Sequence, residues 1–221
     1  MAEHRRNEIL YKGFYPPIYD RSASVHDWYA NYIRTYVERD VRQLLNIRNL
    51  VMFQKFIRLC AARSGQLLNL SSLGNECGIK HNTAMQWLSI LEASYILFLL
   101  QPYYENFSKR LVKSPKLYFY DPGLASWLLG IQSPQELSVH AMRPHLFEGW
   151  ILSEFFKKLF NQGERLPLYF WRDHIGNEID LIFEKQGKIF AAELKSMETF
   201  RRRPIVLTIS YRNRESFLNR M

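Results

Sequence analysis

The feature that most constrains the fold is a pair of β-rich runs close to the C-terminus. They span residues 178–185 and 188–196, and a two-residue turn ending in Gly187 separates them. Two strand-forming runs joined by so short a glycine-containing turn are typical of a β-hairpin. Counting outward from this turn sets Asp180 opposite Glu193. The sequence therefore predicts both the hairpin and its register.

This register gives the hairpin two different faces. Side chains alternate with period two, so Lys195 shares a face with Asp180 and Glu193. Like charges directly opposed across two strands destabilise a sheet, and a divalent cation would remove that penalty. The same count pairs Lys185 with Lys188 and Ile182 with Ala191. The other face is expected to be core, because it is wholly apolar: Ile179, Leu181, Phe183, Phe190, Ala192 and Leu194.

Composition points to a soluble, cytoplasmic protein. The chain has 221 residues and is 47% hydrophobic, enough for one large domain or two small ones. Its two cysteines, Cys60 and Cys77, lack the spacing of metal ligands and fit a reducing compartment. No run approaches the ~20 apolar residues of a membrane span, so no membrane partner is expected. The sequence makes no prediction of the oligomeric state.

The first part of the chain is predicted to be helical and to end in a winged helix-turn-helix module. The segment up to Ser24 is expected to be irregular, because Gly13, Pro16 and Pro17 interrupt any helix. Ser24 is expected to cap the helix that follows. A helix, a short helix, a turn, a longer helix and two strands then occur in the order of a winged helix. The expected helices cover residues 26–45 and 49–63, a short stretch that follows residues 69–72 and ends at 77, and residues 83–94, the last capped by Asn82; the wing strands cover residues 95–104 and 117–120.

The second part is predicted to be an α/β domain. Asp121 and Pro122 are expected to cap and open a helix that stops at Gly130. A loop rich in Ser and Pro, residues 132–144, indicates a domain boundary. A helix over residues 144–160, a strand over 168–172, the hairpin and a last strand over 205–211 form an α/β core with a mixed sheet. The predicted divisions are residues 1–47 (N-terminal segment and helix), 48–134 (winged helix-turn-helix module) and 135–221 (α/β domain).

The carboxylates predict chemistry on phosphates. Glu148 lies one turn into the helix that precedes the sheet and would add a third carboxylate to Asp180 and Glu193. Such a cluster holds one or two Mg²⁺ ions that polarise a phosphodiester and activate water, while Lys195 stabilises developing charge. Two simpler interpretations remain open. The hairpin residues would also suit a solvent-exposed ion pair, and Glu148 would suit an exposed acid that favours its helix dipole.

The net charge of +9 raises the question of nucleic-acid binding. The helix over residues 83–94 offers no arginine for reading bases. The candidate phosphate contacts are instead lysines and one arginine at the start of that helix and in the wing: Lys80, Lys109, Arg110, Lys113 and Lys116. Packing of this module against a partner domain remains the alternative to DNA contact.

Glu148, Asp180 and the Glu193-Leu194-Lys195 run, in helix–strand–strand order, resemble the active-site pattern of the PD-(D/E)XK nuclease superfamily. A longer context, residues 32–41, 87–95, 116–124 and 176–180, is similar to the uncharacterised C-terminal domain of prokaryotic AAA-family ATP-binding proteins. That resemblance covers roughly residues 10–200. It implies an α+β protein in which a winged helix is followed by a restriction-endonuclease-like domain, normally beside a P-loop ATPase domain.

The sequence departs from that family pattern in two places. It contains no G-x-x-x-x-G-K-[ST] run, so no ATP site is expected in this chain. After Phe200 the pattern predicts a helix, whereas here an Arg-Arg-Arg-Pro run leads directly to the last strand, as expected of a truncated or frame-disrupted product. The predicted function is a Mg²⁺-dependent nuclease-like domain acting on DNA. The alternatives are a non-catalytic DNA- or protein-binding module of an ATPase and a decayed fragment of one.

Overall fold

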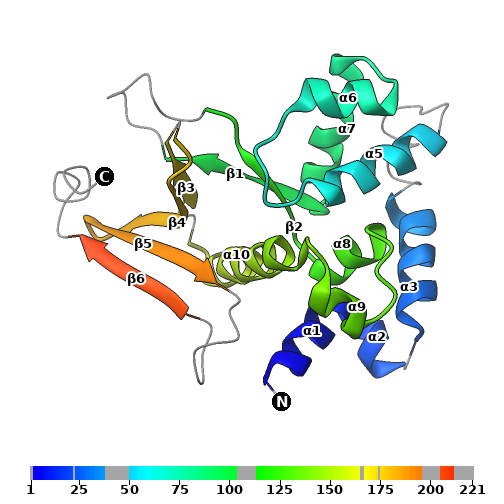
Figure 1. Cartoon of the computed structure of the whole chain (residues 1–221), viewed down its shortest axis with the longest axis horizontal. Helices are drawn as coiled ribbons and strands as arrows, with labels where there is room; N and C mark the ends of the chain where they lie inside the picture. The colour runs from blue at the N-terminus through cyan, green and yellow to red at the C-terminus, as the bar shows by residue number, and fades with distance from the viewer. Residues whose placement is uncertain are drawn as a thin grey trace. The chain divides into compact units, whose positions relative to one another are not determined.

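The computed structural model of the chain describes residues 2–21, 23–37, 50–103, 113–164, 167–173, 175–195 and 205–211 (Figure 1). The chain divides into two compact units, each built from two stretches of sequence. Unit 1 comprises Met1–Phe98 and Leu117–Trp150, and unit 2 comprises Leu99–Lys116 and Ile151–Met221. The bounds of these units fall within helices and strands. The sequence had instead predicted a domain boundary in a loop near residue 135.

The N-terminal segment is helical, which corrects the prediction of an irregular start. Helix α1 spans Ala2–Lys12 and α2 spans Pro16–Asp20. The prolines open α2 at its first positions, where the missing N–H costs nothing. Helix α3, Val25–Tyr32, is capped as predicted by Ser24, whose Oγ accepts from the N–H of Asp27. A π-helical turn, Ile33–Val37, follows, and the rest of the predicted helix lies outside the described residues.

Three helices then occur close to their predicted places. They are α5 (Leu50–Ala62), α6 (Leu70–Cys77) and α7 (His81–Ala93). The N–H of Ser72 donates to Asn69 Oδ1 and caps α6. The predicted cap Asn82 is wrong, because α7 begins one residue before it and its N-cap is Lys80, which makes no side-chain cap bond.

The loop predicted at residues 132–144 contains a helix. Helix α8 spans Pro122–Leu128 and is capped by Asp121 as predicted. Helix α9, Pro134–Val139, follows, with the N–H of Glu136 donating to Ser133 Oγ. Ser and Pro at these positions are therefore a cap and a first helical residue. Helix α10, Arg143–Asn161, is the long helix predicted before the sheet.

A six-stranded sheet runs in the order β2-β1-β3-β4-β5-β6. Strand β1 pairs with β3 in parallel, and the pairs β3–β4, β4–β5 and β5–β6 are antiparallel, so the sheet is mixed. The two predicted wing strands, β1 and β2, thus belong to the same sheet as the hairpin. The bounds are β1 Leu97–Pro102, β2 Lys116–Phe119, β3 Tyr169–Arg172, β4 Glu178–Lys185, β5 Lys188–Lys195 and β6 Ile205–Tyr211.

The hairpin β4–β5 has the predicted register. Lys185 pairs with Lys188 and Ile182 pairs with Ala191, and the ladder runs to Leu181 and Ala192. The face predicted to be polar is, however, partly core. Ile182 and Ala191 are buried on it in a cluster with Tyr103, Trp171 and Ile189. Apolar side chains therefore cover the middle of this face, with Asp180, Glu193 and Lys195 toward the open end of the hairpin and Glu184 beside the turn.

The protein is a mixed α+β fold. No helix in the described ranges has the length and apolar run needed to cross a bilayer.

Candidate functional site

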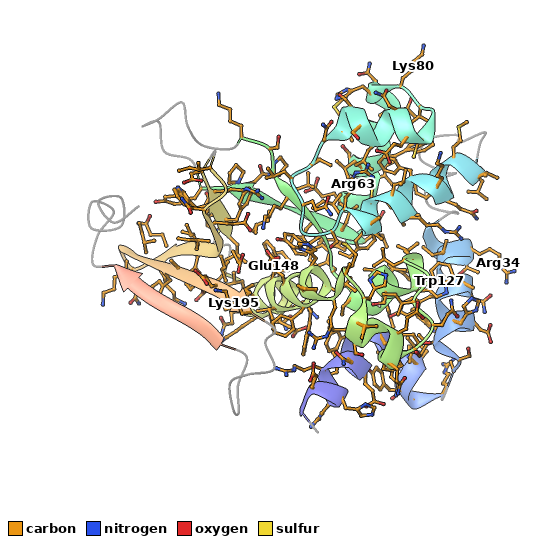
Figure 2. The ribbon with its side chains drawn as sticks, in the orientation of Figure 1. Arg34, Arg63, Lys80, Trp127, Glu148 and Lys195 are labelled. Carbon is orange, nitrogen blue, oxygen red and sulfur yellow. The ribbon has the colours of Figure 1, made fainter. Side chains whose placement is uncertain are left out.

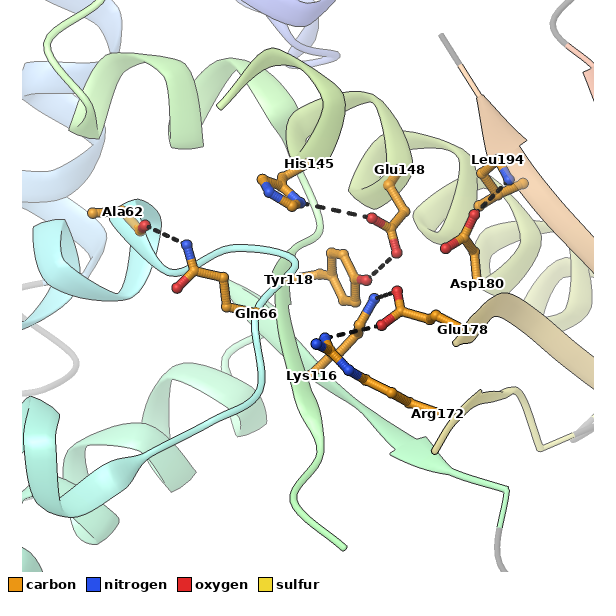
Figure 3. Close-up of polar contacts among 10 residues, drawn as sticks. All are labelled: Ala62, Gln66, Lys116, Tyr118, His145, Glu148, Arg172, Glu178, Asp180 and Leu194. Atoms are coloured by element: carbon orange, nitrogen blue, oxygen red, sulfur yellow. Dashed lines mark hydrogen bonds and ion pairs between the residues drawn. The ribbon is translucent and has the colours of Figure 1, made fainter. Parts of the chain in front are cut away.

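Asp180 lies on β4 at the open end of the hairpin, and its carboxylate is held in place by the neighbouring strand. The backbone N–H of Leu194 on β5 donates to Asp180 Oδ2 at 2.6 Å (Figure 3). One carboxylate oxygen is therefore oriented by the backbone of the residue between Glu193 and Lys195. This contact links β4 to β5 at the open end of the hairpin.

Glu193 and Lys195 form an ion pair on β5. Their side chains are 43% and 58% exposed. The hydrogen bond to Glu193 and the charges of Glu193 and Asp180 raise the pKa of Lys195. The lysine is thus held in its charged form beside both carboxylates.

Glu178 carries two cations that the sequence interpretation did not assign to it. Lys116 Nζ donates to Glu178 Oε1, and Arg172 Nη1 lies 3.1 Å from Glu178 Oε2 (Figure 3). An oxygen of Glu178 lies within 4.8 Å of one of Asp180. Strand alternation could have predicted this neighbour, since Glu178 stands two residues before Asp180 on the same face.

Lys116 is buried, which corrects its predicted place among the phosphate-contacting residues of the wing. Its side chain is 2% exposed, and Nζ lies 5.4 Å from the centroid of the Phe170 ring. A buried ammonium is tolerated only with a close counter-charge, and Glu178 supplies it. Because the sequence showed Lys116 only as the last residue of a basic loop, its partner 62 residues away could not be inferred.

Glu148 lies on α10 and is 7% exposed, so the interpretation as a solvent-exposed helical acid is wrong. The hydroxyl of Tyr118 donates to Glu148 Oε1. His145, one turn earlier on the helix, places Nδ1 3.8 Å from Glu148 Oε2 (Figure 3). Both of these neighbours were missed at the sequence level, because Tyr118 is distant in the chain and His145 stands in no recognised motif.

Of the other residues predicted to contact nucleic acid, Lys80 and Lys113 lie within the described ranges. Lys80 is exposed at the start of α7 and projects away from the ribbon (Figure 2). Lys113 is exposed in the loop before β2. Lys109 and Arg110 lie outside the described residues.

The chemistry of these donors suits a hard divalent cation. Asp180 and Glu193 offer carboxylate oxygens, the ligands that Mg²⁺ prefers, and part of the Glu193 carboxylate faces solvent where a phosphate can approach. Glu178 fits less well, because Lys116 and Arg172 already neutralise its charge. We therefore assign Glu178 to the support of the site.

Two family descriptions match the chain. Residues 3–135 match Domain of unknown function (DUF8612), and residues 144–207 match Domain of unknown function (DUF4143). The curated relatives include Uncharacterized protein Mb2031c of Mycobacterium bovis and Uncharacterized protein Rv2008c of Mycobacterium tuberculosis, each 30% identical over 196 residues. The match covers 87% of this chain and 43% of each relative, so the chain spans less than half their length. No solved structure matches it.

Proposed function

We propose that this chain, which belongs to the family described as Domain of unknown function (DUF8612), carries a Mg²⁺-dependent nuclease-like domain acting on DNA. The observation that carries the proposal is the arrangement at the open end of the β4–β5 hairpin. Asp180 is oriented by the N–H of Leu194, and Glu193 is paired with a fully charged Lys195. The carboxylates of Asp180 and Glu193 would bind the cation, and the charge of Lys195 would stabilise the negative charge that develops on the phosphate.

Each residue has a proposed role. Asp180 and Glu193 are the metal ligands on the hairpin of unit 2, and Glu148, the third carboxylate predicted from the helix–strand–strand order, lies in unit 1. The bound ion would polarise the phosphodiester and activate a water molecule. Lys195 exchanges its contact with Glu193 for the negative charge that develops on the phosphate. The Lys116–Glu178–Arg172 cluster keeps the start of β4 in position.

DNA is the proposed substrate because its backbone attracts dispersed cations without base reading. Lys80, Lys109, Arg110 and Lys113 would supply these contacts from a winged helix-turn-helix module. The order α6, turn, α7 and two strands supports that module, and the order α10, β3, β4, β5 supports a restriction-endonuclease-like domain.

An ATPase domain or subunit is the proposed partner. The support is the resemblance of the sequence to the C-terminal part of AAA-family ATP-binding proteins, together with relatives more than twice as long as the matched region. The chain itself offers no phosphate-binding loop, so ATP would bind only to that partner.

Nicking of supercoiled plasmid DNA tests the proposal. The full chain is expected to relax the plasmid with Mg²⁺ and to lose at least about 100-fold of that activity on Asp180→Asn or Glu193→Ala, because a ligand charge is removed. Asp180→Asn keeps an oxygen that accepts from Leu194, so the backbone arrangement survives. The matched control is Glu164→Gln, since Glu164 is an acid of the same unit that pairs only with Lys185 among the described residues.

Equal nicking by the wild type and both site variants would overturn the proposal. DNA binding without hydrolysis would instead assign the accessory role. That binding should survive Glu193→Ala and weaken when Lys109, Arg110 and Lys113 are neutralised.

A further inference from the structure

His145 occupies a position that the proposed mechanism leaves unused. It lies three residues before Glu148 on α10, so both side chains emerge from one face of the helix. Its Nδ1 atom is buried, and within the described part of the chain it has no hydrogen-bond partner. Glu148 Oε2 lies 3.8 Å from it. Buried polar atoms are nearly always hydrogen-bonded, so a buried ring nitrogen without a hydrogen bond needs an explanation, and binding of an ion is one.

The ring is seated against Gly65. A Cβ added at Gly65 would lie 2.5 Å from His145 Nδ1 and 2.9 Å from its Cγ. The backbone there has a φ of +77° and is fixed by a 2.7 Å hydrogen bond from the Gly65 N–H to the carbonyl of Leu117. Only a residue without a side chain leaves room for the ring in this place.

Tyr118 determines which oxygen of Glu148 faces the histidine. Its hydroxyl donates to Oε1, so Oε2 is the oxygen on the side of Nδ1. Tyr118 follows Leu117, whose carbonyl holds Gly65. One short stretch of β2 therefore positions both members of the His145–Glu148 pair.

The geometry points to His145 and Glu148 as a nitrogen–oxygen chelate for a first-row divalent cation such as Mn²⁺. Ligands at about 2.1 Å on one ion at right angles lie about 3 Å apart. The observed 3.8 Å closes to that separation with a small side-chain rotation. In helical bundles a Glu-x-x-His pair on one helix forms metal sites, and His145 and Glu148 have the same spacing in the reverse order.

The inference rests on the proposed function, since it takes Glu148 as a metal ligand, and it specifies the metal that the His145–Glu148 pair prefers. Carboxylates alone suit Mg²⁺, whereas an imidazole ligand favours transition metals. With His145 as a ligand, the site selects Mn²⁺ over Mg²⁺. Without it, His145 and Glu148 are an ion pair on a helix, and the two metals bind through oxygen alone.

Mn²⁺ added to the full chain tests this assignment by pulsed electron paramagnetic resonance, which detects a coordinated ¹⁴N nucleus. The wild type is expected to show imidazole nitrogen coupling, and His145→Ala is expected to lose it. In titrations, His145→Ala should weaken Mn²⁺ binding about tenfold or more and Mg²⁺ binding less than about threefold. His4→Ala, at an exposed histidine of α1, is the matched control and should change neither.

Each outcome separates this inference from the proposed function. Absence of nitrogen coupling in the wild type overturns the inference whether or not the variant folds, and plasmid nicking in Mg²⁺ would then still support the nuclease. Nitrogen coupling in a protein that never cuts DNA keeps the chelate and removes the nuclease. Equal weakening of Mn²⁺ and Mg²⁺ by His145→Ala also counts against the chelate.

Discussion

Asp121 ties three segments of unit 1 together through one buried carboxylate. It accepts from the N–H of Phe14, from the hydroxyl of Tyr29 and from the N–H of Leu124, each at 2.7 Å. Burial first, and the charge of Asp121 second, raise the pKa of Tyr29, so the hydroxyl remains a neutral donor. The helix cap predicted from the sequence is therefore also the anchor of the N-terminal helices.

Asp121→Ala is expected to destabilise the protein by about 3 kcal/mol, because three donors lose a charged acceptor and two of them are buried. Asp121→Asn should cost less, since its amide oxygen still accepts. Urea unfolding followed by circular dichroism measures both. The control Asp20→Ala, at an exposed acid in α2, should stay within about 0.5 kcal/mol of wild type, and an equal effect at both sites would contradict the anchor.

At the scale of elements, the turn of the β4–β5 hairpin places two consecutive residues in the left-handed region. Gln186 has a φ of 53° and Gly187 a φ of 69°. Such a turn matches the twist of the strands but suits glycine or asparagine far better than glutamine. Space is not the constraint, because a Cβ added at Gly187 meets nothing within 4 Å.

Gly187→Ala is therefore expected to lower the free energy of unfolding by about 1 kcal/mol through backbone strain alone. Gln186→Gly removes the corresponding strain and should be neutral or stabilising by up to about 1 kcal/mol. Thermal melts of the two variants and the wild type provide the comparison. The same sign of change in both variants would show that the turn is not left-handed.

The elements that the sequence predicted well are those with local signals. Alternation and a two-residue turn predicted the hairpin and its register, which the pairing from Leu181–Ala192 to Lys185–Lys188 confirms. Proline misled the prediction twice: Pro16 and Pro134 were interpreted as breakers, yet each opens a helix. Helix α1 has its large apolar residues only at its end, at Ile9, Leu10 and Tyr11, so no helical spacing of apolar residues reveals it.

The residues around the candidate site that could not be predicted are joined by contacts distant in sequence. Lys116 meets Glu178 across 62 residues, and Tyr118 meets Glu148 across 30. Nothing local to either partner identifies the other. Periodicity assigns a residue to a face of its own element, but it does not tell which element covers that face.

At the scale of the whole molecule, unit 2 is assembled from Leu99–Lys116 and Ile151–Met221. Strand β3 pairs with β1 at Gln101 and Pro102, and the core of the hairpin includes Tyr103. A fragment comprising residues 135–221 would lose these partners. It would expose an edge of β3 and leave Glu178 without Lys116.

We expect this 135–221 fragment to lack a cooperative melt and to elute as aggregates in size-exclusion chromatography. The full chain, run beside it, should melt cooperatively. A monomeric fragment that melts cooperatively near the temperature of the full chain would show that the C-terminal stretch folds alone.

The burial of Lys116 also affects the order in which parts of the protein fold during synthesis. A ribosome adds 62 residues between this lysine and Glu178, which takes about 3–12 s at about 5–20 residues per second. Until Glu178 has been synthesised, the Lys116 ammonium has no counter-charge at its final position, so it is more stable when solvated. While the Lys116 side chain remains solvated, the start of β2 cannot pack in its final place. We therefore expect Lys116 to become buried only after β4 has been synthesised.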